Sequence, residues 1–230
     1  MNFLYVSLLL VGLIPSQTTQ PLGTDGVIHF KRAPFSKRIS PRYSISWNMS
    51  VMGASATLSA TVKQEFVRFS EEDDRPLIRW ITTDYSTVGE STPSKKPIDL
   101  TSAVSAMNMP DGIKMTLGQT DFIYLFLGIA GMTTDKDVKV GDVAKVHWKS
   151  RAQNLVLDGT ATILDIKPLD AMSVRWDLKA KMDDNDLGEF HLTSRYDPKD
   201  LTLKTCEGAF QTLGINQPVK VKRLDDSIQN

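Results

Sequence analysis

Apolar and polar residues alternate along RYSISWNMSVM, residues 42–52. A period of two is typical of a β-strand that buries one face. A turn opens at Gly53, and the apolar face continues over Ala54–Val62 in a second predicted strand. The residues expected to face the core from the first strand are Tyr43, Ile45, Trp47, Met49 and Val51.

The second strand changes parity further along, because Val67 and Phe69 are apolar at positions that should be polar. We therefore expect a bulge near Gln64–Phe66. The acidic segment SEEDDRP reads as a loop, and Leu77–Val88, rich in β-branched and aromatic residues, reads as a third strand. These three strands predict an antiparallel meander.

The same alternation returns in the second half of the chain, over AMSVRWDLKAKM at residues 171–182. The connectors DDNDLG and DPKD are rich in Asp, Asn, Gly and Pro, as turns require. A second meander is therefore predicted. Its other strands are Ala144–Lys149, Leu155–Ile166, Glu189–Tyr196 and Leu201–Glu207.

The two halves also share a local pattern. YSISWNM from Tyr43 and MSVRWDL from Met172 both read apolar, Ser, β-branched, any residue, Trp, Asx, apolar. One interpretation is a duplicated meander. The alternative is that alternation alone makes two amphipathic strands alike.

Between the halves lies the least strand-like part, residues 97–132. Ile98–Met107 lacks clean alternation and is compatible with a short helix, and MPDGIK reads as a turn. The segment Asp121–Met132, DFIYLFLGIAGM, has no charge after its aspartate. It is too short to span a bilayer as a helix, which needs about 20 apolar residues.

As a helix this apolar segment would be apolar nearly all round, so it must be enclosed. Asp121 is a candidate cap, and Gly128 and Gly131 are candidate ends. We expect it on the concave face of a curved sheet formed by both meanders. It either completes the core or leaves an apolar cavity, with its glycines allowing it to move as a lid.

The predicted fold is all-β with minor α: two antiparallel meanders forming a curved sheet or open half-barrel around an apolar helical segment, or two tightly packed lobes. The predicted organisation is 1–18 signal peptide, 19–41 basic extended leader, 42–96 first meander, 97–132 connecting segment with short helices, 133–224 second meander and 225–230 tail.

The N-terminal apolar run Phe3–Ile14 has the length and position of a secretory signal, which predicts export to the periplasm or the extracellular space. The alternatives are an uncleaved membrane anchor and a wrongly assigned translation start. If the signal is removed, no membrane-spanning segment is expected. The basic leader that follows is either a solvated tail or a contact for an anionic surface.

Charge and cysteine content narrow the partners. The chain has 27 Lys and Arg residues together and 27 Asp and Glu residues together. It therefore has no net positive charge that would attract nucleic acid. The single cysteine, Cys206, excludes an intrachain disulfide, so stability must come from apolar burial. A buried, inert thiol is the first interpretation of Cys206, and an exposed thiol that links two chains is the second.

Signatures of catalysis and metal binding are missing from the sequence. There is no nucleophile elbow, P-loop or dinucleotide-binding motif. His29, His147 and His191 stand in no metal-ligand spacing, and the latter two read as exposed strand residues. The run DDNDLG lacks the bidentate carboxylate of a calcium loop. We predict no catalytic residue, no metal and no cofactor.

Two short elements carry a resemblance. VKVGD at 138–142 precedes the second-half strands, and YDP at 196–198 is followed by Gly208. With these elements and its layout, the chain resembles uncharacterised exported bacterial β-rich proteins with a half-barrel of the lipoprotein-carrier type. The resemblance covers most of residues 42–210 and implies a fold and an envelope compartment. No functional residue is transferred from it.

Three functions compete at this point. The first is an exported, non-enzymatic protein that binds an apolar or amphiphilic small molecule within the curved sheet. The second is an envelope scaffold that holds another protein by a sheet edge or the leader. The third is an unrecognised hydrolase. The ligand-binding residues of the first hypothesis are Trp47, Phe122, Tyr124, Phe126, Gly128 and Trp176.

Overall fold

The computed structural model describes residues 28–29, 40–51, 54–72, 74–89, 95–105, 107–113, 122–133, 137–167, 170–197 and 201–224. The predicted signal peptide and C-terminal tail lie outside these residues, as do most of the basic leader, the turn residue Gly53 and the candidate cap Asp121. Within the described residues, no helix is long and apolar enough to cross a bilayer.

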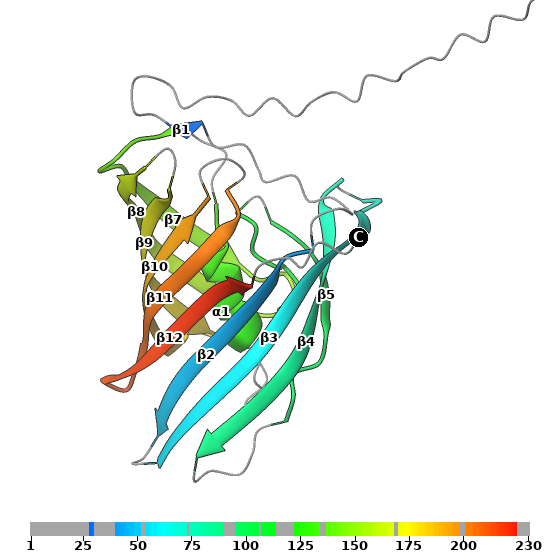
Figure 1. Ribbon diagram of the computed structural model, residues 1–230, viewed down its shortest axis with the longest axis vertical. Coiled ribbons are helices and arrows are strands. Elements are labelled where there is room, and N and C mark those ends of the chain that lie inside the picture. The colour runs from blue at the N-terminus through cyan, green and yellow to red at the C-terminus, as the bar shows by residue number, and fades with distance from the viewer. Residues whose placement is uncertain are drawn as a thin grey trace, which may run out of the picture.

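Ten antiparallel strands form one open sheet, which confirms the all-β prediction (Figure 1). Their order across the sheet is β5-β4-β3-β2-β12-β11-β10-β9-β8-β7. The strands are β2 Arg42–Val51, β3 Ala54–Phe69, β4 Pro76–Gly89, β5 Leu100–Ala103, β7 Val143–Lys149, β8 Leu155–Ile166, β9 Met172–Met182, β10 Asn185–Tyr196, β11 Leu203–Thr212 and β12 Ile215–Leu224.

The two predicted meanders join edge to edge to make this sheet. β12, the last strand of the second meander, pairs with β2, the first strand of the first, through Val219 opposite Trp47 and Val221 opposite Ile45. One continuous sheet therefore forms, rather than two lobes. Within the described residues its outermost strands are β5 and β7, and the chain between them crosses from one edge of the sheet to the other.

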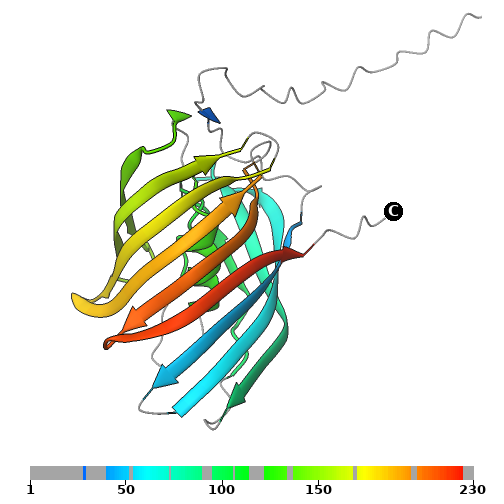
Figure 2. The same ribbon diagram turned by 60° about the vertical axis from the view of Figure 1, so that its left-hand side comes forward.

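The sheet is strongly curved, and the crossing segment carries α1, Phe122–Ala130, within the curve (Figure 2). Every residue of α1 after Phe122 is buried, as its all-round apolar character predicts. The helix ends at Ala130, and Gly131 N donates to Leu127 O. This confirms a helix enclosed on the concave face of the sheet.

Gly128 does not end the helix, so that part of the prediction is wrong. It lies within α1, where the loop before the helix approaches closely. A Cβ added at Gly128 would lie 3.0 Å from both Met109 Sδ and Pro110 Cδ. The glycine allows this close approach rather than a helix stop.

The prediction of a short helix in Ile98–Met107 is also wrong for the described residues of that range. Leu100–Ala103 forms the edge strand β5, with Leu100 opposite Trp80 and Ala103 opposite Leu77. This pairing satisfies backbone N–H and C=O groups of β4 that would otherwise have no partner strand on that side. This tertiary pairing outweighs the weak local pattern.

The expected bulge in β3 is present one residue beyond the predicted range. The register with β4 shifts between Phe66 and Arg68, and a second shift lies between Ser59 and Thr61. Phe66 packs against the core, whereas Val67 and Phe69 stay exposed at 41% and 51%. The change of parity therefore marks a bulge without turning these two side chains inward.

Two smaller features complete the fold. In the predicted leader, β1 (Ile28–His29) pairs antiparallel with β6 (Asp137–Val138). Cys206 is a free, buried thiol, which confirms the first interpretation of this residue. The Trp residues of the repeated pattern, Trp47 in β2 and Trp176 in β9, both face the core, but duplication of the meander stays a prediction.

Candidate ligand-binding cavity

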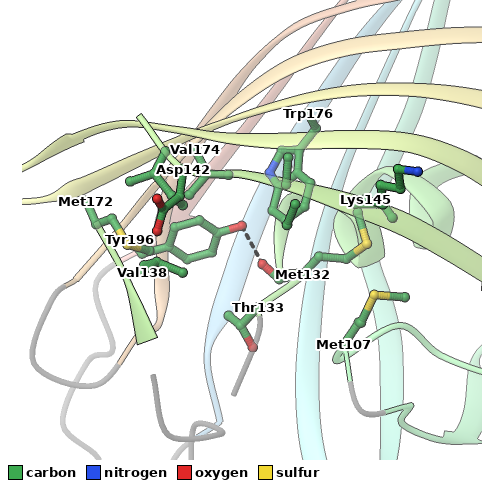
Figure 3. A pocket seen from close by; sticks show the side chains of 14 residues that line it. Met107, Met132, Thr133, Val138, Asp142, Lys145, Met172, Val174, Trp176 and Tyr196 are labelled. Carbon is green, nitrogen blue, oxygen red and sulfur yellow. Dashed lines mark hydrogen bonds between the residues drawn. The ribbon is translucent and has the colours of Figure 1, made fainter. Parts of the chain in front are cut away.

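A cavity of about 260 Å³ lies between the inner face of β7 to β10 and the chain segments on either side of α1 (Figure 3). Its walls are mostly aliphatic, aromatic and methionine side chains. The lining residues are Met107, Met132, Thr133, Val138, Asp142, Ala144, Lys145, Val146, Ala161, Ile163, Met172, Val174, Trp176 and Tyr196.

The sheet wall of the cavity follows from the alternation along β8 and β9. Ile163 and Ala161 point inward from β8, and Val174 and Trp176 point inward from β9. The register sets Ala161 opposite Trp176. Because the alanine side chain is much shorter than its neighbours, Ala161 leaves space on the concave side of the sheet.

The opposite wall is the segment that leaves α1, together with the loop that precedes the helix. Thr133 N donates to Met107 O at 3.2 Å, and Asn108 Nδ2 donates to Thr133 Oγ1. The Tyr196 hydroxyl lies 2.7 Å from the carbonyl oxygens of both Ala130 and Met132 and donates to them. These contacts fix the methionine-bearing segments above the sheet.

Three polar side chains at the sheet wall of the cavity, those of Trp176, Ser194 and Tyr196, already have partners. Trp176 Nε1 donates to Ser194 Oγ at 3.1 Å, and Ser194 Oγ donates to Ala130 O at 3.0 Å. Burial raises the pKa of Tyr196 far above its usual range, so its phenol stays neutral. An occupant therefore meets apolar surface in the interior and cannot gain these groups as hydrogen-bond partners.

The charged residues of the lining are Asp142, which is partly exposed, and Lys145, which is exposed, so they mark the border of the cavity. Asp142 Oδ2 accepts a hydrogen bond from Lys139 N at 2.9 Å. Next to these residues, Val140 and Val143 are exposed at 55% and 63%. The border is thus part apolar and part charged, a pattern that suits an amphiphilic occupant.

Of the six binding residues predicted from the sequence, Trp176 lines this cavity. Three others, Trp47, Phe122 and Phe126, pack with Phe190 and Phe210 in an aromatic cluster. Ring centroids in this cluster are 4.7 to 6.4 Å apart, the spacing of a well-packed core.

The remaining two predicted residues also lie away from the cavity lining. The Tyr124 hydroxyl is 2.8 Å from Thr82 Oγ1, and Gly128 faces Met109. Contact of a ligand with these residues or with the aromatic cluster stays a prediction. The structure brings together a different set, dominated by Met107, Met132 and Met172, that the alternation alone did not single out.

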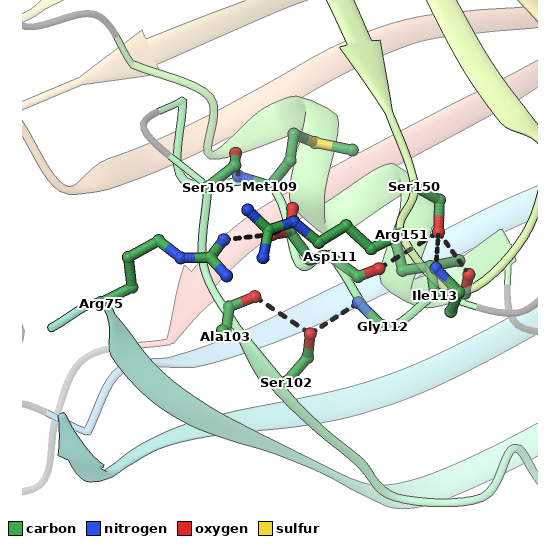
Figure 4. Close-up of polar contacts among 11 residues, drawn as sticks. Arg75, Ser102, Ala103, Ser105, Met109, Asp111, Gly112, Ile113, Ser150 and Arg151 are labelled. Carbon is green, nitrogen blue, oxygen red and sulfur yellow. Dashed lines mark hydrogen bonds and ion pairs between the residues drawn. The ribbon is translucent and has the colours of Figure 1, made fainter. Parts of the chain in front are cut away.

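The loop that carries Met107 is anchored to both ends of the open sheet by Asp111 (Figure 4). The buried Asp111 carboxylate pairs with Arg75, just before β4, and lies 3.5 Å from Arg151 Nε, just after β7. Ser150 Oγ donates to the carbonyl oxygens of Asp111 and Ile113 at 3.2 and 2.9 Å. This cluster ties the two edges of the sheet to one loop.

The histidines of the sheet lie on its outer face, as predicted. His147 Nδ1 is 2.6 Å from Asp158 Oδ1, and His191 Nδ1 is 3.0 Å from Asp177 Oδ1. Both pairs are exposed to solvent. Across the part of the chain that the structure describes, no group of three or more His, Cys, Asp or Glu side chains is arranged to hold a metal ion.

Comparison with known proteins finds little. No family model and no curated protein matches the chain. A crystal structure described as "putative outer membrane lipoprotein-sorting protein domain from Vibrio parahaemolyticus" is similar at 13% identity and a TM-score of 0.21. The match covers 81% of this chain and 83% of that one. The neighbour is of the type that the sequence resemblance names.

Proposed function

We propose that the protein is an exported, non-enzymatic binding protein that holds one apolar or amphiphilic molecule in the cavity beside Trp176. The observation that carries the proposal is a mostly apolar space of about 260 Å³ at whose sheet wall the polar groups of Trp176 and Tyr196 have partners. Small-molecule sites are concave and mostly apolar, with volumes from about 300 Å³ upward. The cavity is slightly smaller than the lower end of that range.

Binding would be driven by removal of apolar surface from water. Each buried methylene of the occupant contributes about 0.8 kcal/mol. The three methionines, Met107, Met132 and Met172, have flexible side chains that adapt to different apolar shapes. Such a lining should select ligands by the length of their apolar chain rather than by one chemical structure.

Export is proposed from the sequence alone. The apolar run Phe3–Ile14 has the length of a secretory signal and lies outside the described residues. In this proposal the mature protein works in the periplasm or outside the cell. There it would meet amphiphilic molecules of the envelope.

An envelope scaffold is the second candidate, and one observation favours it. β7 is an outermost strand of the sheet, and among the residues that the structure describes only β8 pairs with it in this sheet. Such an edge can accept an extended segment of another protein. In that case the partner would pair with β7, and small amphiphiles would not bind with useful affinity.

The test is to fill the cavity with a larger side chain in place of Ala161 on the sheet. Ala161→Phe places a phenyl ring in the space opposite Trp176, and Ala161→Leu is a milder version. Binding of the uncharged fluorophore N-phenyl-1-naphthylamine should be saturable in the unchanged protein and at least about tenfold weaker in Ala161→Phe. Thr162→Phe adds the same bulk on the opposite face of β8 and is the matched control.

Equal affinity for the fluorophore in the unchanged protein, Ala161→Phe and Ala161→Leu would refute the cavity as the binding site. Circular dichroism and unfolding curves show whether each variant folds. If Ala161→Phe does not fold, Ala161→Leu must still weaken binding relative to Thr162→Phe.

A further inference from the structure

The size of the cavity limits the apolar part of its ligand. A volume of about 260 Å³ is below the roughly 300 to 1,000 Å³ of most small-molecule sites. The space therefore encloses one slim apolar chain, whereas several chains side by side would remain largely outside. This inference rests on the proposed function and specifies the chemical class of its ligand.

An anionic head group finds no free hydrogen-bond donor at Tyr196 or Trp176, the two lining residues with buried polar groups at the sheet wall. The Tyr196 hydroxyl is used by Ala130 O and Met132 O, and the Trp176 indole N–H is used by Ser194. A polar group buried there would lose its hydration without gaining a partner, which costs several kcal/mol. The head group must therefore lie at the charged border, near Asp142 and Lys145.

The negative groups at this border are already engaged. Asp142 Oδ2 accepts the hydrogen bond from Lys139 N, and Asp142 N donates to Lys139 O in the same tight turn. Asp137, next to the lining residue Val138, also has an interaction partner. A cationic head group would have to compete with these contacts.

Lys145 differs from these residues. It borders the cavity from the edge strand β7, its side chain is exposed, and it has no ion-pair partner among the described residues. In Figure 3 it lies at the periphery of the lining side chains. A negative charge at the border of the cavity would therefore displace no ion pair at Lys145.

We propose that the ligand is a single-chain amphiphile with an anionic head group, such as a fatty-acid carboxylate, and that Lys145 pairs with this head group. The apolar chain lies against Met132, Met172 and Trp176, and the carboxylate lies at the border. Because the pair is exposed to solvent, Lys145 selects among head groups and adds little to affinity. Removal of its charge should weaken binding of the anion roughly two- to fivefold.

The experiment is titration calorimetry with three ligands that share a ten-carbon chain: decanoate, decan-1-ol and decyltrimethylammonium, each below its aggregation concentration. The proteins are the unchanged chain, Lys145→Gln, Lys145→Glu and Lys149→Glu. Lys149 is the matched control because it is another exposed lysine of β7 but does not line the cavity.

We expect the unchanged chain and Lys149→Glu to bind decanoate more tightly than decyltrimethylammonium. Lys145→Gln should reduce this preference, and Lys145→Glu should reverse it by about tenfold in the ratio of the two affinities. The preference for decanoate should also become smaller as the salt concentration rises from about 20 to about 500 mM, because salt screens the attraction between Lys145 and the carboxylate.

Two results would overturn the assignment of Lys145 while leaving the cavity function standing. One is the same order of affinities in the unchanged chain and in Lys145→Glu. The other is a preference of the unchanged chain for decyltrimethylammonium. If none of the three ligands binds the unchanged chain, the proposed function itself fails, and this inference fails with it.

Discussion

Asp111 shows how a single residue holds the open sheet in shape. Its carboxylate is buried and pairs with Arg75, just before β4, while Arg151 approaches it from just after the edge strand β7. Asp111→Asn keeps the size of the side chain but removes the charge. We expect the free energy of unfolding to fall by about 1 to 3 kcal/mol, because Arg75 loses a charged hydrogen-bond partner in a mostly buried position.

Urea unfolding of Asp111→Asn measures this loss, with Glu71→Gln as the control. Glu71 also pairs with an arginine, Arg68, but both side chains are exposed. An exposed pair contributes at most about 1 kcal/mol. Equal losses in the two variants would contradict the anchoring role of Asp111.

Cys206 offers a second test at the residue scale. Burial raises the pKa of the Cys206 thiol to about 12 from an ordinary value of 9.0. The folded state therefore favours the neutral thiol: its contribution to stability is complete below pH 9.0 and is lost as the pH rises through about 12. Iodoacetamide at pH 8 should leave the native protein unmodified.

Because Cys206 is the only cysteine of the chain, mass spectrometry after alkylation reports on this thiol alone. Alkylation should become fast once the protein is unfolded in urea. Equal rates in the native and unfolded protein would show that the thiol is accessible, contrary to its burial in β11.

At the scale of elements, α1 has two different surroundings. Phe126 faces the aromatic cluster of Trp47, Phe190 and Phe210, whereas the end of the helix leads to Met132 in the cavity wall. Phe126→Ala should lower the free energy of unfolding by about 3 to 5 kcal/mol, since it leaves a void among packed rings. Denaturant titration checks this value.

The same variant separates the aromatic cluster from the cavity. Below its unfolding transition, Phe126→Ala should bind N-phenyl-1-naphthylamine within about twofold of the unchanged chain, because Phe126 does not line the cavity. A loss of binding comparable to that of Ala161→Phe would instead support the aromatic cluster as the ligand site, as the sequence suggested.

Alternation predicted most strands because each long strand buries one face of this sheet. β2, β4, β8 and β9 were found within one residue of their ends for that reason. β5 was missed, since its four residues are held by pairing with β4 rather than by their own pattern. β12 was included in the second meander but not recognised as a separate strand. Pro218 in its middle is unusual for a paired strand.

At the scale of the whole molecule, the join between β12 and β2 could not be predicted from local patterns. These strands lie at opposite ends of the chain, and only their pairing decides between one sheet and two lobes. The cavity depends on the same long-range order. Trp176 was identified because it faces inward, but the gap beside Ala161 exists only in this register and beneath this position of Met132.

The central claim is that the space among Met107, Met132 and Met172 holds an amphiphile. The chain has nine methionines, so methyl-¹³C methionine labelling gives probes both inside and outside the cavity. Titration with decanoate, followed by NMR, tests the claim directly. Saturable shifts at Met107, Met132 and Met172, with Met49 and Met182 unchanged, are the predicted result. Shifts confined to Met49 and Met182, or no shifts at saturating decanoate, would contradict it.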